Sequence, residues 1–228
     1  MKTFIKASLL LTIVALWAGS ATTLSAATTI FDNSSNDLST RFNPGSLQVG
    51  DQIKLATTDP YARYMTLFSF EYYGYGFNTT FPEQFTGDVK AKVSFYLNDG
   101  ALFNGYAMPG TMFWTSGFFD VPGPTSRNTF EFTAGADNIP AEGLFLPASE
   151  FTWTVQFLGM DGGDVVGLDI YSPPTVGQDY PDYWENNGGW QLMTNSVAPT
   201  MNFAAKIQAV PEPSTVTLSI LGGLSILT

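Results

Sequence analysis

Acidic side chains in loops are the first groups in this sequence that could do chemistry. Asp161 and Asp164 flank a Gly-Gly step, and Asp179, Asp182 and Glu185 follow in a second polar stretch. Calcium takes roughly six to eight oxygen ligands from flexible loops, so the four aspartates are a candidate calcium site. The alternative is that Asp-Gly-Gly-Asp is an ordinary turn, because it lacks the spacing of an EF-hand loop.

Aromatic side chains are the second candidate group. Tyr180, Tyr183, Trp184 and Trp190 sit among Asp, Asn and Gly residues. Exposed rings stack on the apolar faces of sugars while amides and carboxylates take the hydroxyls, so these four are candidate sugar-binding residues. The alternative is that they fill the edges of a core. A second group of rings is also expected in a glycine-rich loop: Tyr72, Tyr73, Tyr75 and Phe77.

Catalysis is restricted by two missing residue types. The chain has no cysteine and no histidine, which excludes Ser-His-Asp and Cys-His nucleophiles and His- or Cys-ligated zinc. A glycosidase needs two carboxylates roughly 5 to 9.5 Å apart. The available glutamates are Glu71, Glu131, Glu150 and Glu185. Nothing in their spacing indicates that any two converge, so we predict that the protein is not an enzyme.

These groups must be positioned by β-strands, because apolar residues alternate with polar ones. The alternation is clear over 89–97, 151–157, 68–72 and 166–170, and weaker over 47–55, 111–119, 129–133, 189–193 and 203–207. A period of two puts one face of a strand in a core and the other toward solvent. Asn98-Asp99-Gly100 predicts a tight hairpin turn, with a partner strand starting at Ala101.

Short strands separated by Pro-Gly, Asp-Gly and Asn-Gly steps predict an all-β fold. We expect a single antiparallel β-sandwich, jelly-roll-like, over residues 27–208. A closed barrel and two smaller domains are the alternatives. No helix is expected outside the two ends of the chain.

The N-terminus has the features of a signal peptide over residues 1–26. Lys2 and Lys6 form a positive region, the stretch 7–17 is apolar, and Ser25-Ala26-Ala27 offers small residues at a cleavage site. Signal peptidase is therefore an expected partner, cleaving after Ala26 or Ala27. An uncleaved anchor is the alternative.

The C-terminus carries a rigid box followed by an apolar tail over residues 209–228. The box is Val210-Pro211-Glu212-Pro213-Ser214, in which the prolines fix φ and disfavour helix. The tail Thr215–Thr228 has no charged residue and predicts a membrane helix. It is shorter than the roughly 20 residues that span a bilayer.

These residues resemble the PEP-CTERM sorting signal, in which such a box precedes a membrane helix and a basic end. The resemblance implies cleavage by an exosortase-type enzyme and passage to the cell envelope or extracellular surface, with a transient membrane anchor. Because the basic end is absent, we expect the natural tail to continue beyond Thr228.

The middle of the chain is also similar to exported domains of PEP-CTERM proteins. The similarity rests on Ile30-Phe31-Asp32-Asn33, Asn98-Asp99-Gly100, Pro109-Gly110-Thr111, the run 151–155 and the run 171–177. It implies a secreted β-sandwich and a place in extracellular matrix or biofilm, and it assigns no chemistry.

Charge narrows the partners of the exported part. Without Lys2 and Lys6, seven basic residues face twenty acidic ones, and phosphate binding needs clustered cations. We therefore expect no nucleic-acid partner. The predicted function is a structural or adhesive surface protein without cofactor. The alternative is a carbohydrate-binding module for envelope or extracellular polysaccharide, with calcium as a candidate stabilising ion.

Overall fold

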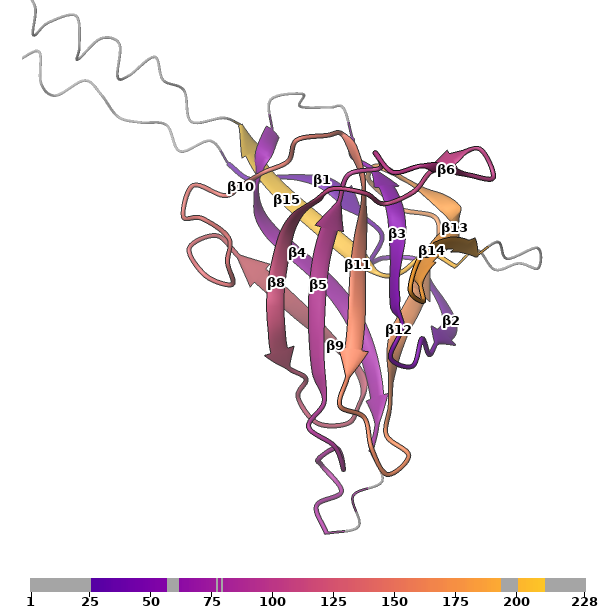
Figure 1. The fold of residues 1–228 in the computed structure, drawn as a ribbon. Helices are drawn as coiled ribbons and strands as arrows, with labels where there is room; N and C mark the ends of the chain where they lie inside the picture. The colour runs from indigo at the N-terminus through magenta and orange to yellow at the C-terminus, as the bar shows by residue number, and fades with distance from the viewer. Residues whose placement is uncertain (1–25, 57–61, 77, 79, 194–200, 212–228) are drawn as a thin grey trace, which may run out of the picture. The chain divides into compact units, whose positions relative to one another are not determined.

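The computed structural model describes residues 26–56, 62–76, 78, 80–193 and 201–211. Every regular element in these ranges is a β-strand and every strand pair is antiparallel, so the all-β prediction is confirmed (Figure 1). The predicted helices at the two ends fall outside the described residues. In the described part of the chain, no helix has the length and apolarity needed to cross a membrane.

Sheet A has seven strands organised around the long strand β4. Along one edge, β4 pairs first with β15 and then with β12. Strand β15 also pairs with β1, and β12 also pairs with β2. The other edge of β4 pairs with β10 and β9. The strands are β1 (Thr28–Asp32), β2 (Asp37–Phe42), β4 (Ala62–Tyr75), β9 (Thr125–Thr133), β10 (Leu144–Phe145), β12 (Val165–Tyr171) and β15 (Ala205–Pro211).

Sheet B has six strands in the order β14-β13-β3-β11-β5-β8. Their bounds are β3 (Gln48–Lys54), β5 (Lys90–Tyr96), β8 (Met112–Asp120), β11 (Glu150–Leu158), β13 (Gln178–Asn186) and β14 (Trp190–Met193). A separate two-stranded hairpin is formed by β6 (Leu102–Phe103) and β7 (Tyr106–Ala107). In the view of Figure 1, sheet B lies in front of sheet A.

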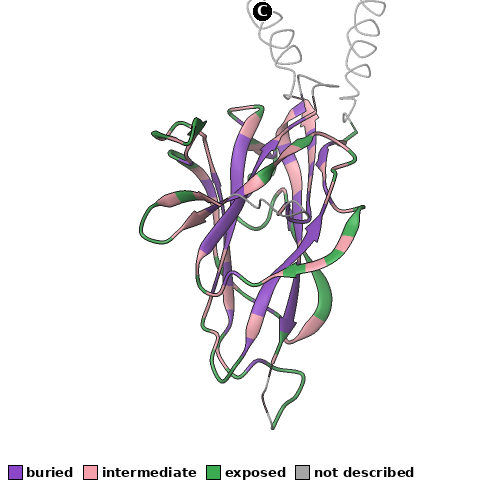
Figure 2. Ribbon diagram, turned by 90° about the vertical axis from the view of Figure 1, so that its right-hand side faces the viewer, coloured by how far each residue is buried: buried purple, intermediate pink, exposed green. Residues whose placement is uncertain are grey.

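The core lies between the two sheets and is dense in aromatic rings. The inward positions of β11, from Phe151 through Trp153 to Phe157, are fully buried, as the alternation predicts. The ring of Phe68 on sheet A lies 5.4 Å from that of Trp153 and 5.0 Å from that of Phe95 on sheet B. Figure 2 shows the buried residues concentrated along the facing strands. Ring contacts across the two sheets therefore hold the layers together.

The hairpin predicted at Asn98-Asp99-Gly100 is wrong. Strand β5 pairs with β8, from Lys90 opposite Asp120 to Tyr96 opposite Met112. The segment between them instead carries the β6–β7 hairpin, whose turn is made by Asn104 and Gly105 with φ of 51° and 89°. Asp99 joins the two ends of the segment that carries this hairpin, because its carboxylate accepts the backbone N–H and the hydroxyl of Thr111, both at 2.7 Å.

The first and last strands of the described chain pair with each other. Thr28 lies opposite Ala209, and Asp32 lies opposite Lys206. Strand β15 continues past the expected boundary at residue 208, since Val210 and Pro211 remain paired with β4. A compact unit from Ala27 to Glu212 contains all of these strands.

Candidate functional site

The outward face of sheet B is lined with polar residues. On β3, Val49, Asp51 and Ile53 are buried on the core side, while Gln48 and Gln52 alternate with them and bond to outward residues of β11. Because successive side chains of a strand point to opposite faces, this alternation gives the sheet one aromatic side and one amide- and hydroxyl-rich side.

Gln48 is the centre of a hydrogen-bond network on this outward face. Its Nε2 donates to the Thr154 hydroxyl at 2.8 Å and to the Tyr96 hydroxyl at 3.2 Å, and its Oε1 accepts from Asn186 Nδ2 at 3.4 Å. The ring of Tyr96 meets that of Trp190 edge to face, with centroids 5.4 Å apart. We call Gln48, Tyr96, Asn186 and Trp190 the sheet B strip.

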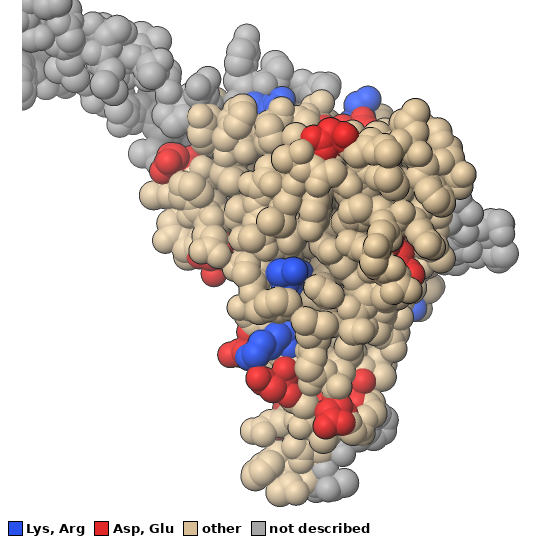
Figure 3. Space-filling view, viewed as in Figure 1, with Lys and Arg blue, Asp and Glu red and all other residues tan. Residues whose placement is uncertain are grey.

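The surface around the sheet B strip is mostly uncharged. Figure 3, viewed as Figure 1, shows uncharged residues over most of the face, with charged groups scattered singly or gathered toward its lower end. Tyr96, Asn186 and Trp190 are partly exposed. Two rings beside the amide of Asn186 on a neutral surface can stack on a sugar ring and bond its hydroxyls. Gln48 is only 7% exposed and positions Tyr96 and Asn186 through its hydrogen bonds.

Two of the four predicted sugar-binding aromatics are not exposed. Tyr183 and Trp184 follow each other on β13 and so point to opposite faces. The Tyr183 ring packs in the core, 5.0 Å from that of Phe42. Trp184 has no exposed surface, and its ring lies 6.5 Å from that of Phe103 in the β6–β7 hairpin. The exposed platform expected from these two rings is therefore wrong.

Tyr180 and Trp190 are the two predicted aromatics that reach the surface in part. The Tyr180 hydroxyl donates to Glu150 Oε1 at 2.9 Å, and Gln52 Nε2 donates to the same oxygen at 2.6 Å. Burial and this carboxylate raise the pKa of Tyr180 to about 12. Tyr180 is thus held in place by Glu150.

The second group of rings belongs to a strand, so its placement in a loop is wrong. Tyr72, Tyr73 and Tyr75 lie on β4, and Tyr72 and Tyr73 are buried. The glycine that suggested a loop, Gly74, leaves room for a neighbouring ring, because a Cβ there would lie 2.7 Å from Phe85. Phe77 lies outside the described residues.

The carboxylate of Asp164 serves as an acceptor for backbone groups. Its oxygens accept the N–H groups of Thr86 at 3.0 Å and Gly87 at 2.8 Å, and that of Asp161 at 3.3 Å. Asp161 in turn accepts the N–H of Gly162 at 2.7 Å. These bonds fix the turn after β11 against the segment before β5. The stretch from Asp161 to Asp164 therefore forms a turn, as the alternative to a calcium site predicted.

The other two predicted calcium ligands lie elsewhere. Asp179 lies opposite Ile53, and Ile53 lies opposite Phe151 near the start of β11, whereas Asp161 follows the end of β11. Asp182 is on β13, and burial raises its pKa. Across the described ranges, no three acidic side chains lie close enough to hold a metal ion.

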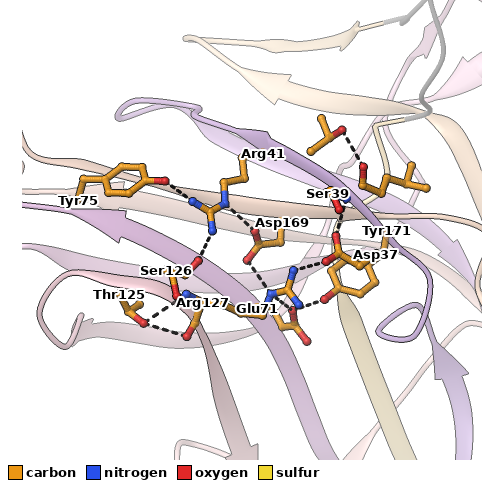
Figure 4. A network of polar contacts seen from close by, with 12 residues as sticks. Asp37, Ser39, Arg41, Glu71, Tyr75, Thr125, Ser126, Arg127, Asp169 and Tyr171 are labelled. Atoms are coloured by element: carbon orange, nitrogen blue, oxygen red, sulfur yellow. Dashed lines mark hydrogen bonds and ion pairs between the residues drawn. The ribbon is translucent and has the colours of Figure 1, made fainter.

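The outward face of sheet A carries a network of charged residues (Figure 4). Arg41 Nε lies 3.3 Å from Asp169 Oδ1, and Arg127 Nε lies 3.5 Å from Glu71 Oε2. Arg127 also pairs with Asp37. Burial raises the pKa of Asp169 although both arginines oppose the shift. Since the charges compensate one another and join β2, β12, β4 and β9, this network stabilises the sheet.

The described residues predicted to be processed lie at the margins of the compact unit. Ala26 and Ala27 come directly before β1, and Val210 and Pro211 end β15. The remaining box residues, Glu212, Pro213 and Ser214, fall outside the described residues.

One residue of the sheet B strip, Tyr96, is missing from the sequence prediction, and for other named residues the sequence did not reveal their neighbours. Tyr96 closes a strand that was recognised, but its partner Trp190 is brought to it only by the pairing of β13 with β3 and β14. Glu71 and Glu131 line one pocket on sheet A, although their spacing gave no sign of this. Which residues become neighbours on a sheet is set by the register of the paired strands, and the alternation of apolar and polar residues does not reveal that register.

In comparisons with known proteins, no family model, no curated protein and no solved structure matches this chain.

Proposed function

We propose that the chain is the precursor of an exported cell-surface protein with a structural or adhesive role. Signal peptidase removes residues 1–26, an exosortase-type enzyme cleaves at the box Val210–Ser214, and the tail is a transient membrane anchor. The released part is a passive domain in the cell envelope or extracellular matrix, without catalysis of its own.

The observation that carries this proposal is the ladder between β1 and β15. Thr28 pairs with Ala209, so the first and last strands of the unit lie side by side, and this supports processing next to both of them. The compact unit runs from Ala27 to Glu212, so removal of residues 1–26 and cleavage after Pro211 would leave every strand intact. A protein that is cleaved near both termini must have a domain that stays folded after both cleavages.

The order in which the chain visits the two sheets supports a jelly-roll-like sandwich. From β3 to β5 and again from β11 to β13, each successive strand crosses to the opposite sheet. Such crossing connections are typical of Greek-key and jelly-roll sandwiches. A rigid sandwich of this kind suits a surface role, because its stability needs neither disulfide nor cofactor.

Substitution in the box tests the sorting proposal. Glu212→Ala together with Pro213→Ala changes the box outside β15, so the fold should remain. We expect the variant to keep its tail and stay with the membrane fraction of the host, while the matched control Gln208→Ala is processed normally. Wild-type processing of the box variant would reject cleavage by an exosortase-type enzyme.

A second function, polysaccharide binding, is favoured by the sheet B strip. Tyr96 and Trp190 meet at 5.4 Å beside the amides of Gln48 and Asn186. In an affinity gel containing envelope polysaccharide, Trp190→Ala should remove most of the retardation, because the stacking of the Trp190 ring on the sugar is lost. Phe145→Ala is the control, since Phe145 is equally aromatic and exposed but belongs to sheet A. Equal retardation of all three proteins would reject the site.

A further inference from the structure

Four polar residues form a row across the outward face of sheet A. Asp32 on β1 lies opposite Lys206 on β15, Lys206 lies opposite Ser69 on β4, and Ser69 lies opposite Glu131 on β9. Directly opposite residues of antiparallel strands point to the same face with Cβ atoms about 4.5 to 5.5 Å apart. The four side chains therefore stand side by side.

A pocket of about 180 Å³ opens over the middle of this row. Its polar lining consists of Ser34, Ser69, Glu71, Thr129, Glu131 and Lys206, and we call it the sheet A pocket. It is smaller than the roughly 300 to 1,000 Å³ of pockets that enclose drug-sized ligands. A ligand of this pocket is thus a small molecule or a single residue of a polymer.

Two of the charged groups at the pocket already have partners. The Tyr171 hydroxyl donates to Glu71 Oε2 at 2.7 Å, and Arg127 approaches the same oxygen, as Figure 4 shows. On the other side, Lys206 Nζ lies 3.5 Å from Asp32 Oδ2. These contacts fix Glu71 and Lys206 in the lining of the pocket.

Other groups of the sheet A pocket have no partner in the described part of the chain. Glu131 is exposed and makes no ion pair or hydrogen bond through its carboxylate, and the Ser69 hydroxyl makes no hydrogen bond although Ser69 is only 7% exposed. The Thr129 hydroxyl is also free. Because these free hydroxyls and the Glu131 carboxylate line the pocket, they are available to bond a ligand in it.

The charge balance at the pocket favours a cationic ligand. The pocket is lined by two carboxylates, Glu71 and Glu131, and by one cation, Lys206. Lys206 is paired with Asp32, and Glu71 with Arg127. Arg127 is shared with Asp37 as well, and this leaves Glu131 uncompensated. No three acidic groups in the described residues are placed to hold a metal ion, so an organic cation is the better match.

We propose that the sheet A pocket binds an amino sugar that carries a primary ammonium group. Glu131 accepts hydrogen bonds from the ammonium, and the hydroxyls of Ser69 and Thr129 bond the neighbouring sugar hydroxyls. The free oxygen of Glu71 accepts a further hydroxyl. This site is separate from the sheet B strip and does not depend on it.

Titration calorimetry of the intact chain with four monosaccharides tests the proposal. Glucosamine and galactosamine should bind with dissociation constants on the order of millimolar, and N-acetylglucosamine and glucose should bind at least tenfold more weakly because they lack the charge. Equal binding of glucose and glucosamine, or no binding of any of the four, would overturn the proposal.

Variants locate the binding to the pocket. Glu131→Gln should weaken glucosamine binding tenfold or more, and Ser69→Ala severalfold, with an unchanged melting temperature for the exposed Glu131. The control Glu142→Gln alters an exposed acid outside the pocket and should bind like the wild type. Wild-type affinity in Glu131→Gln would contradict the assignment even if glucosamine binds elsewhere.

Discussion

At the residue scale, adjacent side chains in a strand have different roles because they face different surroundings. Tyr183 packs in the core, whereas Trp184 lies under the β6–β7 hairpin. From the polar residues around them, Tyr183 and Trp184 were predicted to be exposed rings like Tyr180 and Trp190. The sequence could predict the polar and aromatic character of β13, but it could not predict which ring a hairpin from 80 residues earlier in the chain covers.

Two carboxyl groups on sheet B, those of Asp51 and Asp179, have raised pKa values, and Asp179 is one of the four aspartates predicted to bind calcium. Asp51 is 1% exposed on the core side of β3 and accepts the backbone N–H of Phe203. Burial raises its pKa well above the usual value, and the nearby Asp179 adds to the shift. Burial also raises the pKa of Asp179 to about 6. Both shifts favour the neutral acid in the folded state.

Asp179 should give the protein an unusual pH dependence. Its pKa is raised on folding from 3.8 to about 6, so the folded state holds a proton that the unfolded chain has released. The stability that this proton contributes is complete below about pH 4 and is lost as the pH rises to about 6. We expect the free energy of unfolding in urea to fall across this range.

Asp179→Asn isolates this effect. The variant should lose part of the fall between pH 4 and 6 and be more stable than the wild type at pH 7 by about 1 to 2 kcal/mol, after allowance for solvent screening. Glu142→Gln, at an exposed position, is the matched control. A variant that is less stable than the wild type at pH 7 would show that the ionised carboxylate is needed.

At the element scale, alternation located most of the strands but not their partners. The runs 89–97, 151–157 and 166–170 correspond to β5, β11 and β12. The partner of β5 was missed because Asn98-Asp99-Gly100 does not form the turn, which is made by Asn104 and Gly105. The row from Asp32 to Glu131 is likewise a product of register among four strands that are distant in sequence.

Strand β15 should be essential for stability, because it fills the position between β1 and β4. Ile207 is fully buried, opposite Phe31 on one side and Phe68 on the other. Ile207→Ala should lower the free energy of unfolding by roughly 2 to 5 kcal/mol through the cavity that it leaves. Gln208→Ala, partly exposed on the same strand, should change it by less than about 0.5 kcal/mol. Equal thermal shifts in the two variants would show that β15 is not packed in this position.

At the scale of the whole molecule, the first and last strands of the fold lie next to the two predicted processing signals in the sequence. The sequence predicted an all-β middle between two apolar ends, and the strands of the compact unit agree with the first part. The pairing of β1 with β15 adds that the unit is closed by the residues next to both signals. Removal of residues 1–26, or of the tail after Pro211, should therefore leave the fold unchanged.

Intact mass spectrometry of the protein recovered from outside its host cells tests this central claim most directly. The account predicts a chain that starts at Ala27 or Thr28 and ends within or just after the box Val210–Ser214, with the apolar tail gone. Recovery of the unprocessed chain, with residues 1–26 and the tail both present in the cytosol, would contradict it.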